Sequence, residues 1–265
     1  MTSDQTISSP EPMTELALSM ADAVRPLIAQ HFRKRLTIET KDDASPVTIA
    51  DREAEALMRA MIADAFPDHG IRGEEFGLHQ ADAEWVWVLD PIDGTKSFIS
   101  GSLAFGTQIA LLYRGRPVLG LIDQPITGER WLGRTGLPTL FGTQPIRCSS
   151  VENLADAVLY TSARDHFDGT QAPRYDRLAC STRFNRSSHD CYAAGLLALG
   201  LVDILAEANV YDYDILPQAP IILGAGGIIT DWAGLPLPDG RVFDTVLISA
   251  NAVLHRAALA ALKID

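Results

Sequence analysis

Residues 85–95 read Trp-Val-Trp-Val-Leu-Asp-Pro-Ile-Asp-Gly-Thr, so a strongly apolar run ends in two closely spaced carboxylates. The β-forming residues at 85–89 predict a strand. Pro91 prevents regular strand pairing beyond that point, and Gly94 can adopt the positive φ of a turn. Asp90 and Asp93 are therefore expected to point at one spot at the mouth of a sheet. Two carboxylates at such a short separation repel each other unless a cation lies between them.

Two further segments carry acidic residues where a fold does not ordinarily need them. Glu74 and Glu75 follow a short predicted strand at 70–72, and Asp214 lies at the start of a predicted helix. Taken singly, each feature has an ordinary explanation. The two glutamates would suit a solvated loop, Asp214 would suit a helix N-cap, and the Asp-Gly pair at 93–94 is common in plain turns.

The combination has a more specific meaning. A helix is predicted to begin at Thr95, directly after the paired carboxylates, and the first N–H groups of a helix bind anions, phosphate especially. Carboxylates are the ligands that Mg²⁺ prefers. Hard-metal ligands beside a phosphate cradle are the arrangement that magnesium-dependent phosphate chemistry requires.

The composition excludes several classes of protein. The 265 residues include 34 Asp and Glu against 22 Lys and Arg, a net charge of −12, whereas nucleic-acid and anionic-membrane binders need a basic face. Residues 1–13 contain neither a basic residue nor an apolar run, so no signal peptide is expected. The longest apolar stretch, 191–202, is shorter than the roughly 20 residues of a membrane span. Three cysteines without CxxC spacing favour buried thiols in a reducing cytoplasm. We therefore predict a cytoplasmic protein without nucleic-acid or membrane partners.

The hydrophobic pattern predicts a layered α/β fold in two subregions, preceded by a disordered segment at 1–13. The N-terminal subregion, 14–146, is expected to hold a helix from Thr14 that Pro26 kinks or divides, a helix at about 50–65 capped by Thr48, and strands at 70–72, 85–89, 106–113, 118–122 and 131–132. The C-terminal subregion, 147–265, is expected to hold strands at 157–160, 202–207, 228–230 and 246–248, and helices at 191–199, 215–223 and 253–262. The surface of the helix at 50–65 is expected to carry the charged residues Arg52, Glu53, Glu55 and Arg59.

The acidic segments also carry a family resemblance. The run Asp90-Pro-Ile-Asp-Gly-Thr95, with Gly73-Glu-Glu75 before it and Asp214 and Ala225-Gly-Gly227 after it, resembles the inositol monophosphatase superfamily. The resemblance extends from about Leu16 to Leu262. It implies an αβαβα sandwich of the inositol monophosphatase and fructose bisphosphatase type, usually a homodimer. It also implies hydrolysis of a small phosphorylated metabolite with two or three Mg²⁺ ions, by direct attack of a water molecule and without a covalent enzyme intermediate.

The resemblance implies a metal-binding role for the matching residues. Glu74, Asp90 and the carbonyl of Ile92 would hold one ion. Asp90, Asp93 and Asp214 would hold a second, and Glu74 would line a third, water-rich site.

It also implies phosphate-binding and catalytic residues. The backbone N–H groups of Gly94 and Thr95, beside Asp93, would bind the phosphate. The Thr95 hydroxyl, oriented by Asp51, would position the attacking water, so the candidate catalytic residues are Glu74, Thr95 and Asp51. A mobile loop containing Lys41, Ser45 and Pro46 would cover the site, as in relatives.

The segment 186–192 bears on the substrate. Its Asp-Cys-Tyr string at 190–192 resembles the histidinol-phosphate phosphatase branch, where inositol-type members tend to have a small neutral residue at the place of Asp190. Histidinol phosphate carries an ammonium and an imidazole, which Asp190 and Glu207 could contact. Inositol has no charge besides its phosphate, and the four lysines of the chain are few for a bisphosphate substrate. Arg186 is a further candidate for substrate binding.

Several alternatives stay open at this stage. Asp190 could instead cap a helix that begins at Cys191. Arg183 and Arg186 could reach the site of a neighbouring subunit or hold surface carboxylates, and His189 has no assigned role. The substrate could be inositol 1-phosphate or a broader range of sugar phosphates. The chain could also be a non-catalytic member that keeps the fold, although every expected metal ligand is present.

Overall fold

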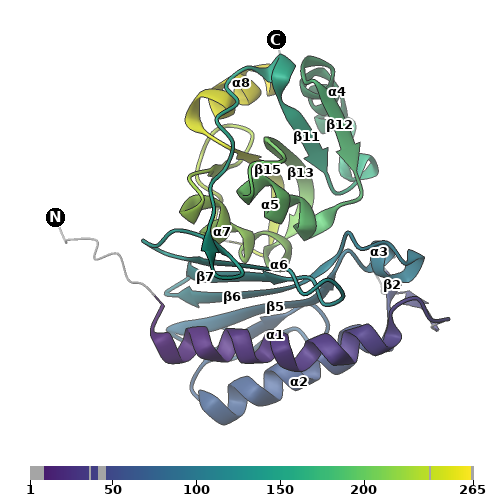
Figure 1. Cartoon of the computed structure of the whole chain (residues 1–265), viewed down its shortest axis with the longest axis vertical. Coiled ribbons are helices and arrows are strands. Elements are labelled where there is room, and N and C mark those ends of the chain that lie inside the picture. The colour runs from purple at the N-terminus through teal and green to yellow at the C-terminus, as the bar shows by residue number, and fades with distance from the viewer. Residues whose placement is uncertain (1–8, 36, 41–45, 239, 264–265) are drawn as a thin grey trace.

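Five layers of alternating helices and sheets make up the molecule (Figure 1). The computed structural model describes residues 9–35, 37–40, 46–238 and 240–263. The outer layers are the helix pairs α1 (Glu11–His31) with α2 (Ile49–Ala65), and α4 (Gln171–Ser181) with α8 (Ala252–Leu262). Between the two sheets lie α5 (Asp190–Ala198), α6 (Asp212–Ile215) and α7 (Gln218–Gly224). This order of layers confirms the predicted αβαβα sandwich.

The first sheet has eight strands in the order β10-β9-β8-β7-β6-β5-β3-β4. Only β3 and β5 run parallel to each other; every other neighbouring pair in this described sheet is antiparallel. The strands are β3 (Gly70–Gly73), β4 (Leu78–His79), β5 (Trp85–Asp93), β6 (Gly106–Tyr113), β7 (Arg116–Asp123), β8 (Arg130–Arg134), β9 (Leu140–Phe141) and β10 (Gln144–Pro145).

The second sheet has five strands in the order β12-β11-β13-β15-β14. Its strands are β11 (Val158–Thr161), β12 (Phe184–Ser187), β13 (Ile204–Tyr211), β14 (Ile228–Thr230) and β15 (Val242–Ser249). The short elements are β1 (Glu39–Thr40), β2 (Pro46–Val47), α3 (Thr95–Ser100), η1 (Leu154–Asp156) and η2 (Arg164–His166). The two sheets are thus built from segments before and after residue 146, while the division into two subregions stays a prediction. No helix among the described residues is long and apolar enough to cross a membrane.

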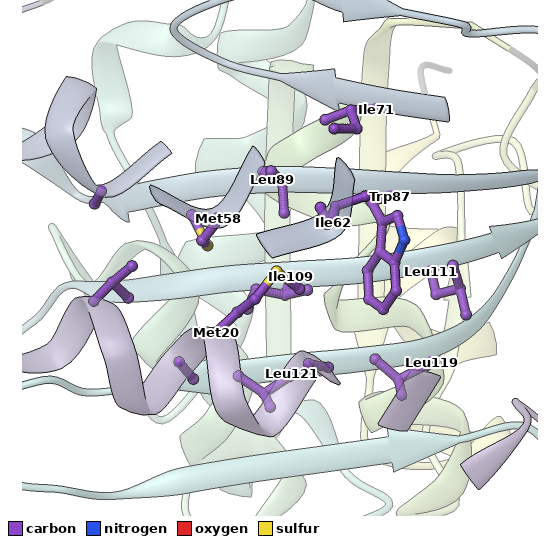
Figure 2. Packing of buried hydrophobic residues seen from close by; sticks show 14 of the residues in the cluster. Met20, Met58, Ile62, Ile71, Trp87, Leu89, Ile109, Leu111, Leu119 and Leu121 are labelled. Carbon is purple, nitrogen blue, oxygen red and sulfur yellow. The ribbon is translucent and has the colours of Figure 1, made fainter. Parts of the chain in front are cut away.

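Strand β5 is buried on both faces, which explains its almost continuous apolar sequence. Trp87 and Leu89 face α1 and α2, where they pack in one cluster with Met20 and Met58 (Figure 2). The intervening valines of β5 face the opposite side, in the cluster that contains Tyr213 of α6. The strand that ends at the acidic residues is therefore fixed between two helical layers.

The helix predictions need three corrections. Helix α1 begins at Glu11, so residues 11–13 of the segment predicted to be disordered are helical; residues 1–8 lie outside the described part. Helix α1 is also not divided at Pro26, since it continues to His31, and Val24 and Ile28 on either side of the proline are fully buried. The helix predicted at 215–223 is instead divided into α6 and α7 at Pro217, which lacks the N–H group that a continuous helix would use.

The structure confirms Thr48 as the cap of α2, but two charged residues predicted on the surface of this helix are completely or largely buried. The Thr48 side chain accepts the N–H of Ala50, and the side chain of Asp51 accepts the N–H of Thr48. Glu55, expected at the surface, is completely buried, and Arg59 is largely buried beside it. Helix α4 and strand β12 were not among the predicted elements.

Two glycines let α7 lie directly on the first sheet. Gly120 of β7 and Gly133 of β8 are paired across the strands, and a Cβ at Gly133 would lie 2.5 Å from Ile221 Cα. The neighbouring atoms are backbone and cannot turn aside. We expect Gly133→Ala to lower the free energy of unfolding by about 1–3 kcal/mol, measured by urea denaturation. Gly169→Ala is the control, because nothing lies within 4 Å of a Cβ there; equal stability of the two variants would contradict this account.

Candidate active site

Three aspartates converge where β5 ends. One oxygen each of Asp90, Asp93 and Asp214 lies within 4.8 Å of the others. Pairing of β5 with β6 shifts register between Asp90 and Asp93, as expected from the intervening proline, and this irregularity brings both carboxylates to the same place. Asp214 arrives from α6, in the other half of the chain.

Glu74 joins the same group from the neighbouring strand. Because β3 and β5 are parallel and Gly73 is paired with Leu89, the residue after β3 lies beside the end of β5. The Glu74 N–H donates to Leu89 O at 3.2 Å, and the side chain lines the cleft above the aspartates. The structure therefore brings together all four acidic residues predicted as metal ligands.

The electrostatics of this group suit a divalent cation. Asp90 is only 1% exposed. Burial, together with the charges of Glu74, Asp93 and Asp214, raises the pKa of Asp90 well above its usual value. The pKa values of Asp93 and Asp214 are raised in the same direction, first by burial. A cation among these oxygens would remove the mutual repulsion, so the side chains present fit a hard metal ion such as Mg²⁺.

The backbone turns sharply beyond the aspartates. Ile92 N donates to Asp90 Oδ1 at 3.1 Å, and the Thr95 hydroxyl donates to the Ile92 carbonyl at 3.1 Å. Gly94 has φ of 88° and directly precedes α3, which begins at Thr95 as predicted. Ile92, Gly94 and Thr95 therefore lie together at the site, in an arrangement only a glycine adopts readily at position 94.

The expected bond between Asp51 and Thr95 is not made among the described residues. Asp51 Oδ2 instead accepts the Thr48 N–H at 2.9 Å and the Thr48 hydroxyl at 2.6 Å. Asp51 Oδ1 is buried without a hydrogen-bond partner in the described structure, and burial raises the pKa of this carboxyl to about 6. The role of Asp51 in orienting Thr95 stays a prediction.

Asp93 also holds the start of α5. Its Oδ2 accepts the N–H of Cys191 at 2.5 Å. The capping alternative for Asp190 is wrong, because Asp190 is the first residue of α5 and the carboxylate at that helix end belongs to Asp93. Asp190 has φ of 39°, a left-handed conformation that aspartate tolerates.

The Asp190 side chain lies beside the predicted phosphate-binding turn. Ser97 Oγ donates to Asp190 Oδ2 at 3.4 Å, and a Cβ at Gly94 would come within 2.8 Å of that oxygen. Burial raises the pKa of Asp190 to about 6. The carboxylate is therefore poised next to Gly94, where it could contact the organic part of a substrate.

A cleft of about 740 Å³ connects these groups with Glu207 on β13. Glu207 is 5% exposed, and its carboxylate accepts the N–H of Ser162 at 2.8 Å and the hydroxyl of Thr161 at 3.2 Å. Burial, opposed by these hydrogen bonds, raises the pKa of Glu207 to about 8. Asp190 and Glu207 thus line one cavity with Glu74, Asp93 and Asp214.

Other predicted residues lie elsewhere or stay without a role. Arg186 is exposed on the edge strand β12 and is not among the described residues that line the cleft. His189 bonds to Ser187 O at 2.9 Å and packs on Tyr160, so it is satisfied locally. Lys41 and Ser45 of the predicted covering loop lie outside the described residues.

The sequence reasoning missed several cleft residues. Lys96 directly follows the acidic motif and could have been found from its place in the first turn of α3. The others come from η2, from β13 and from the helices after it, where no local pattern marked them; they are Asp165, His166, Asn209, Tyr211, Tyr213 and Gln218.

The raised pKa of Glu207 predicts a pH dependence of stability. The folded state binds this proton up to about pH 8, whereas the ordinary pKa is 4.5. The carboxyl therefore favours the folded state fully below about pH 4.5, and this contribution is lost as the pH rises to about 8. We expect Glu207→Gln to flatten the fall in the free energy of unfolding between these values, measured by urea denaturation with the metal chelated. An unchanged slope in the variant would show that the pKa of Glu207 is not raised in the folded protein.

Comparison with known proteins gives consistent matches along most of the chain. The model of the inositol monophosphatase family matches residues 9–264. The chain is 44% identical over 253 residues to "Bifunctional phosphatase IMPL2, chloroplastic" of Arabidopsis thaliana, covering 92% of this chain and 73% of that protein. It is 35% identical over 254 residues to "Histidinol-phosphatase" of Chlorobaculum parvum, covering 95% and 96%.

A solved structure extends the match to the fold. The structure of an inositol monophosphatase from Zymomonas mobilis superposes with a TM-score of 0.88 at 41% identity, covering 97% of this chain and all of that chain. Sequence, fold and the order of the acidic elements therefore agree: the chain belongs to the inositol monophosphatase family.

Proposed function

We propose that this phosphoric monoester hydrolase depends on Mg²⁺ and converts histidinol phosphate to histidinol and phosphate, a step of histidine biosynthesis. The observation that carries the proposal is the pair of carboxylates, Asp190 and Glu207, in the same cleft as the acidic metal-binding group. The 35% identity to a protein named histidinol-phosphatase supports the same substrate.

In the proposed metal centre, Glu74, Asp90, Asp93, Asp214 and the Ile92 carbonyl would hold two or three Mg²⁺ ions. When bound, Mg²⁺ lowers the pKa of water and offsets negative charge on the phosphoryl group. The backbone N–H groups of Gly94 and Thr95 would orient the phosphate beside Asp93.

Two side chains are assigned to the attacking water. The Thr95 hydroxyl would hold the water in line with the bond that breaks, and Asp51 would accept a hydrogen bond from that hydroxyl. The support for Asp51 is its buried Oδ1, which has no hydrogen-bond partner among the described residues. A buried acceptor of this kind is rare in folded proteins, and a role in the reacting complex would account for it.

Substrate selection rests on charge. The ammonium of histidinol phosphate would meet Asp190, and Glu207 would meet the ammonium or a ring nitrogen. Each carboxylate is desolvated, so a cationic partner would stabilise its ionised form strongly. A neutral polyol would leave both groups without such a partner.

An inositol monophosphatase or a broader sugar-phosphate phosphatase is the second candidate. It is supported by the 41% identity to the Zymomonas mobilis enzyme and by the word bifunctional in the name of the Arabidopsis relative. A non-catalytic role is opposed by the presence of all four acidic ligands in one group. A homodimer, in which Arg186 or Arg183 could reach the neighbouring site, and a cytoplasmic location stay predictions.

Phosphate release provides the direct test. We expect the purified protein to release phosphate from histidinol phosphate when Mg²⁺ is present, to stop when EDTA is added, and to recover with excess Mg²⁺. Inositol 1-phosphate, assayed under the same conditions, is expected to give a lower kcat/KM. Equal or greater kcat/KM on inositol 1-phosphate would favour the second candidate, and no metal-dependent release from either substrate would contradict the proposed activity.

A further inference from the structure

The loop that carries Glu74 is held by a buried carboxylate on α2. Glu55 is 0% exposed and accepts the N–H of Glu75 at 2.7 Å through Oε2. Its Oε1 accepts the N–H of Phe76 at 3.1 Å. The two backbone N–H groups directly after Glu74 thus both donate to the side chain of Glu55, which belongs to α2.

Arg59 completes this support from the next turn of α2. Its Nε donates to Glu55 Oε1 at 2.7 Å, and its NH2 group donates to Gly77 O at 2.5 Å. Gly77 O also accepts the N–H of Gly73 at 2.9 Å, which closes the loop. A side chain at Gly73 would overlap the carboxylate of Glu55, so the loop and the pair fit closely together.

The consequence for Glu74 is geometric. Its own N–H donates to Leu89 O, the residue before it bonds to Gly77, and the residue after it bonds to Glu55. The backbone is therefore fixed immediately before, at and after Glu74. This restricts where the Glu74 carboxylate can lie relative to Asp90.

Stability alone does not account for such a pair. Replacing a buried ion pair with apolar residues of similar volume is often neutral or stabilising, because desolvation offsets the attraction of the charges. In contrast, residues that orient the metal ligands without touching the metal commonly affect the affinity for the metal.

We propose that Glu55, braced by Arg59, is a positioning residue for the metal centre, and that it sets Mg²⁺ affinity by holding the 73–77 loop with Glu74 aimed at Asp90. The inference rests on the proposed role of Glu74 as a metal ligand. Glu55 touches neither substrate nor metal in this scheme, and it acts only through the loop.

Titration with MgCl₂ alone, followed by isothermal calorimetry, tests the proposal. Glu55→Gln removes the charge that pairs with Arg59 and places an amide N–H₂ against backbone donors. We expect the Mg²⁺ dissociation constant to rise about 10- to 100-fold, while saturating Mg²⁺ largely restores kcat. Glu53→Gln is the matched control on the same helix, because the Glu53 side chain is 47% exposed; its Mg²⁺ affinity is expected to be that of the unaltered protein.

The possible outcomes are distinct. Unaltered Mg²⁺ affinity in a folded Glu55→Gln protein overturns the proposal. If circular dichroism shows that this variant does not fold, Arg59→Lys decides instead, because one ammonium cannot reproduce the planar fork that reaches both Glu55 and Gly77. Weakened Mg²⁺ binding in Arg59→Lys supports the proposal, and unaltered binding overturns it. If Glu74→Gln leaves Mg²⁺ binding of the protein unchanged, the assignment of Glu74 fails, and with it the proposed metal centre.

Discussion

Replacing Asp90 with asparagine is expected to lower kcat/KM for the phosphomonoester by about 10³-fold or more. Asp90 lies among the acidic residues Glu74, Asp93 and Asp214 that are proposed to hold the ions. An amide keeps the shape but loses the charge, and the metal contribution to such reactions is several kcal/mol, with each 1.36 kcal/mol equal to a factor of ten. The measurement is steady-state phosphate release at saturating Mg²⁺.

In the metal-free protein, the same substitution is expected to increase the thermal stability. Asp90 is buried beside three other carboxylates, so its ionised form is costly when no cation is present. Thermal unfolding in EDTA should therefore show a higher Tm for Asp90→Asn than for the unaltered protein, and added Mg²⁺ should raise the Tm of the unaltered protein more. Asp68→Asn, which removes an exposed charge, is the control. Retention of activity within tenfold by Asp90→Asn would contradict the assigned metal site.

Asp190→Asn is expected to reduce kcat/KM for histidinol phosphate by about 10- to 100-fold and to leave inositol 1-phosphate nearly unaffected. A hydrogen bond between charged groups contributes about 1.5–3 kcal/mol, and only the first substrate supplies a cation. Asparagine tolerates the left-handed backbone at position 190, so the substitution tests the charge rather than the fold.

The comparison needs a matched loss of charge in the same cleft. Asp165→Asn provides it, because Asp165 lines the cleft but is exposed on η2. Its effect on histidinol phosphate is expected to be several times smaller. Equal losses on both substrates in Asp190→Asn would remove the argument that this residue selects the substrate.

The acidic site was predictable because its signals are local. Pro91 and Gly94 fix the irregular end of β5 within a few residues, and the order of the motifs supplied the metal ligands through the family resemblance. The continuous run of apolar, β-forming residues at 85–89 likewise predicted the strand correctly, and β5 is buried along almost its whole length. Features of this kind depend on neighbouring residues in the sequence, so they can be predicted without knowing their tertiary contacts.

The contacts that were missed depend on residues distant in sequence. Asp93 and Cys191 are 98 positions apart. The sequence around Asp190 therefore did not show that the carboxylate capping α5 comes from the end of β5. Glu55 was expected at the surface because periodicity assigns a charged residue to the polar face, whereas its partners at 75 and 76 belong to a separate loop. Strand β12 is exposed along its length and pairs only with β11 among the described strands, so it left no hydrophobic pattern.

Because Asp214 comes from the second half of the chain, metal binding would affect how well the folded protein resists proteolysis in a cell. Asp90 and Asp93 belong to β5 of the eight-stranded sheet, whereas Asp214 belongs to α6, the helix that follows β13. An ion shared among them would act as a removable cross-link that only the assembled chain can bind, and such a ligand stabilises the native state in proportion to the logarithm of its concentration. Magnesium depletion would then expose the chain to proteolysis as well as stop its catalysis, so the abundance of the enzyme would follow the supply of its own cofactor.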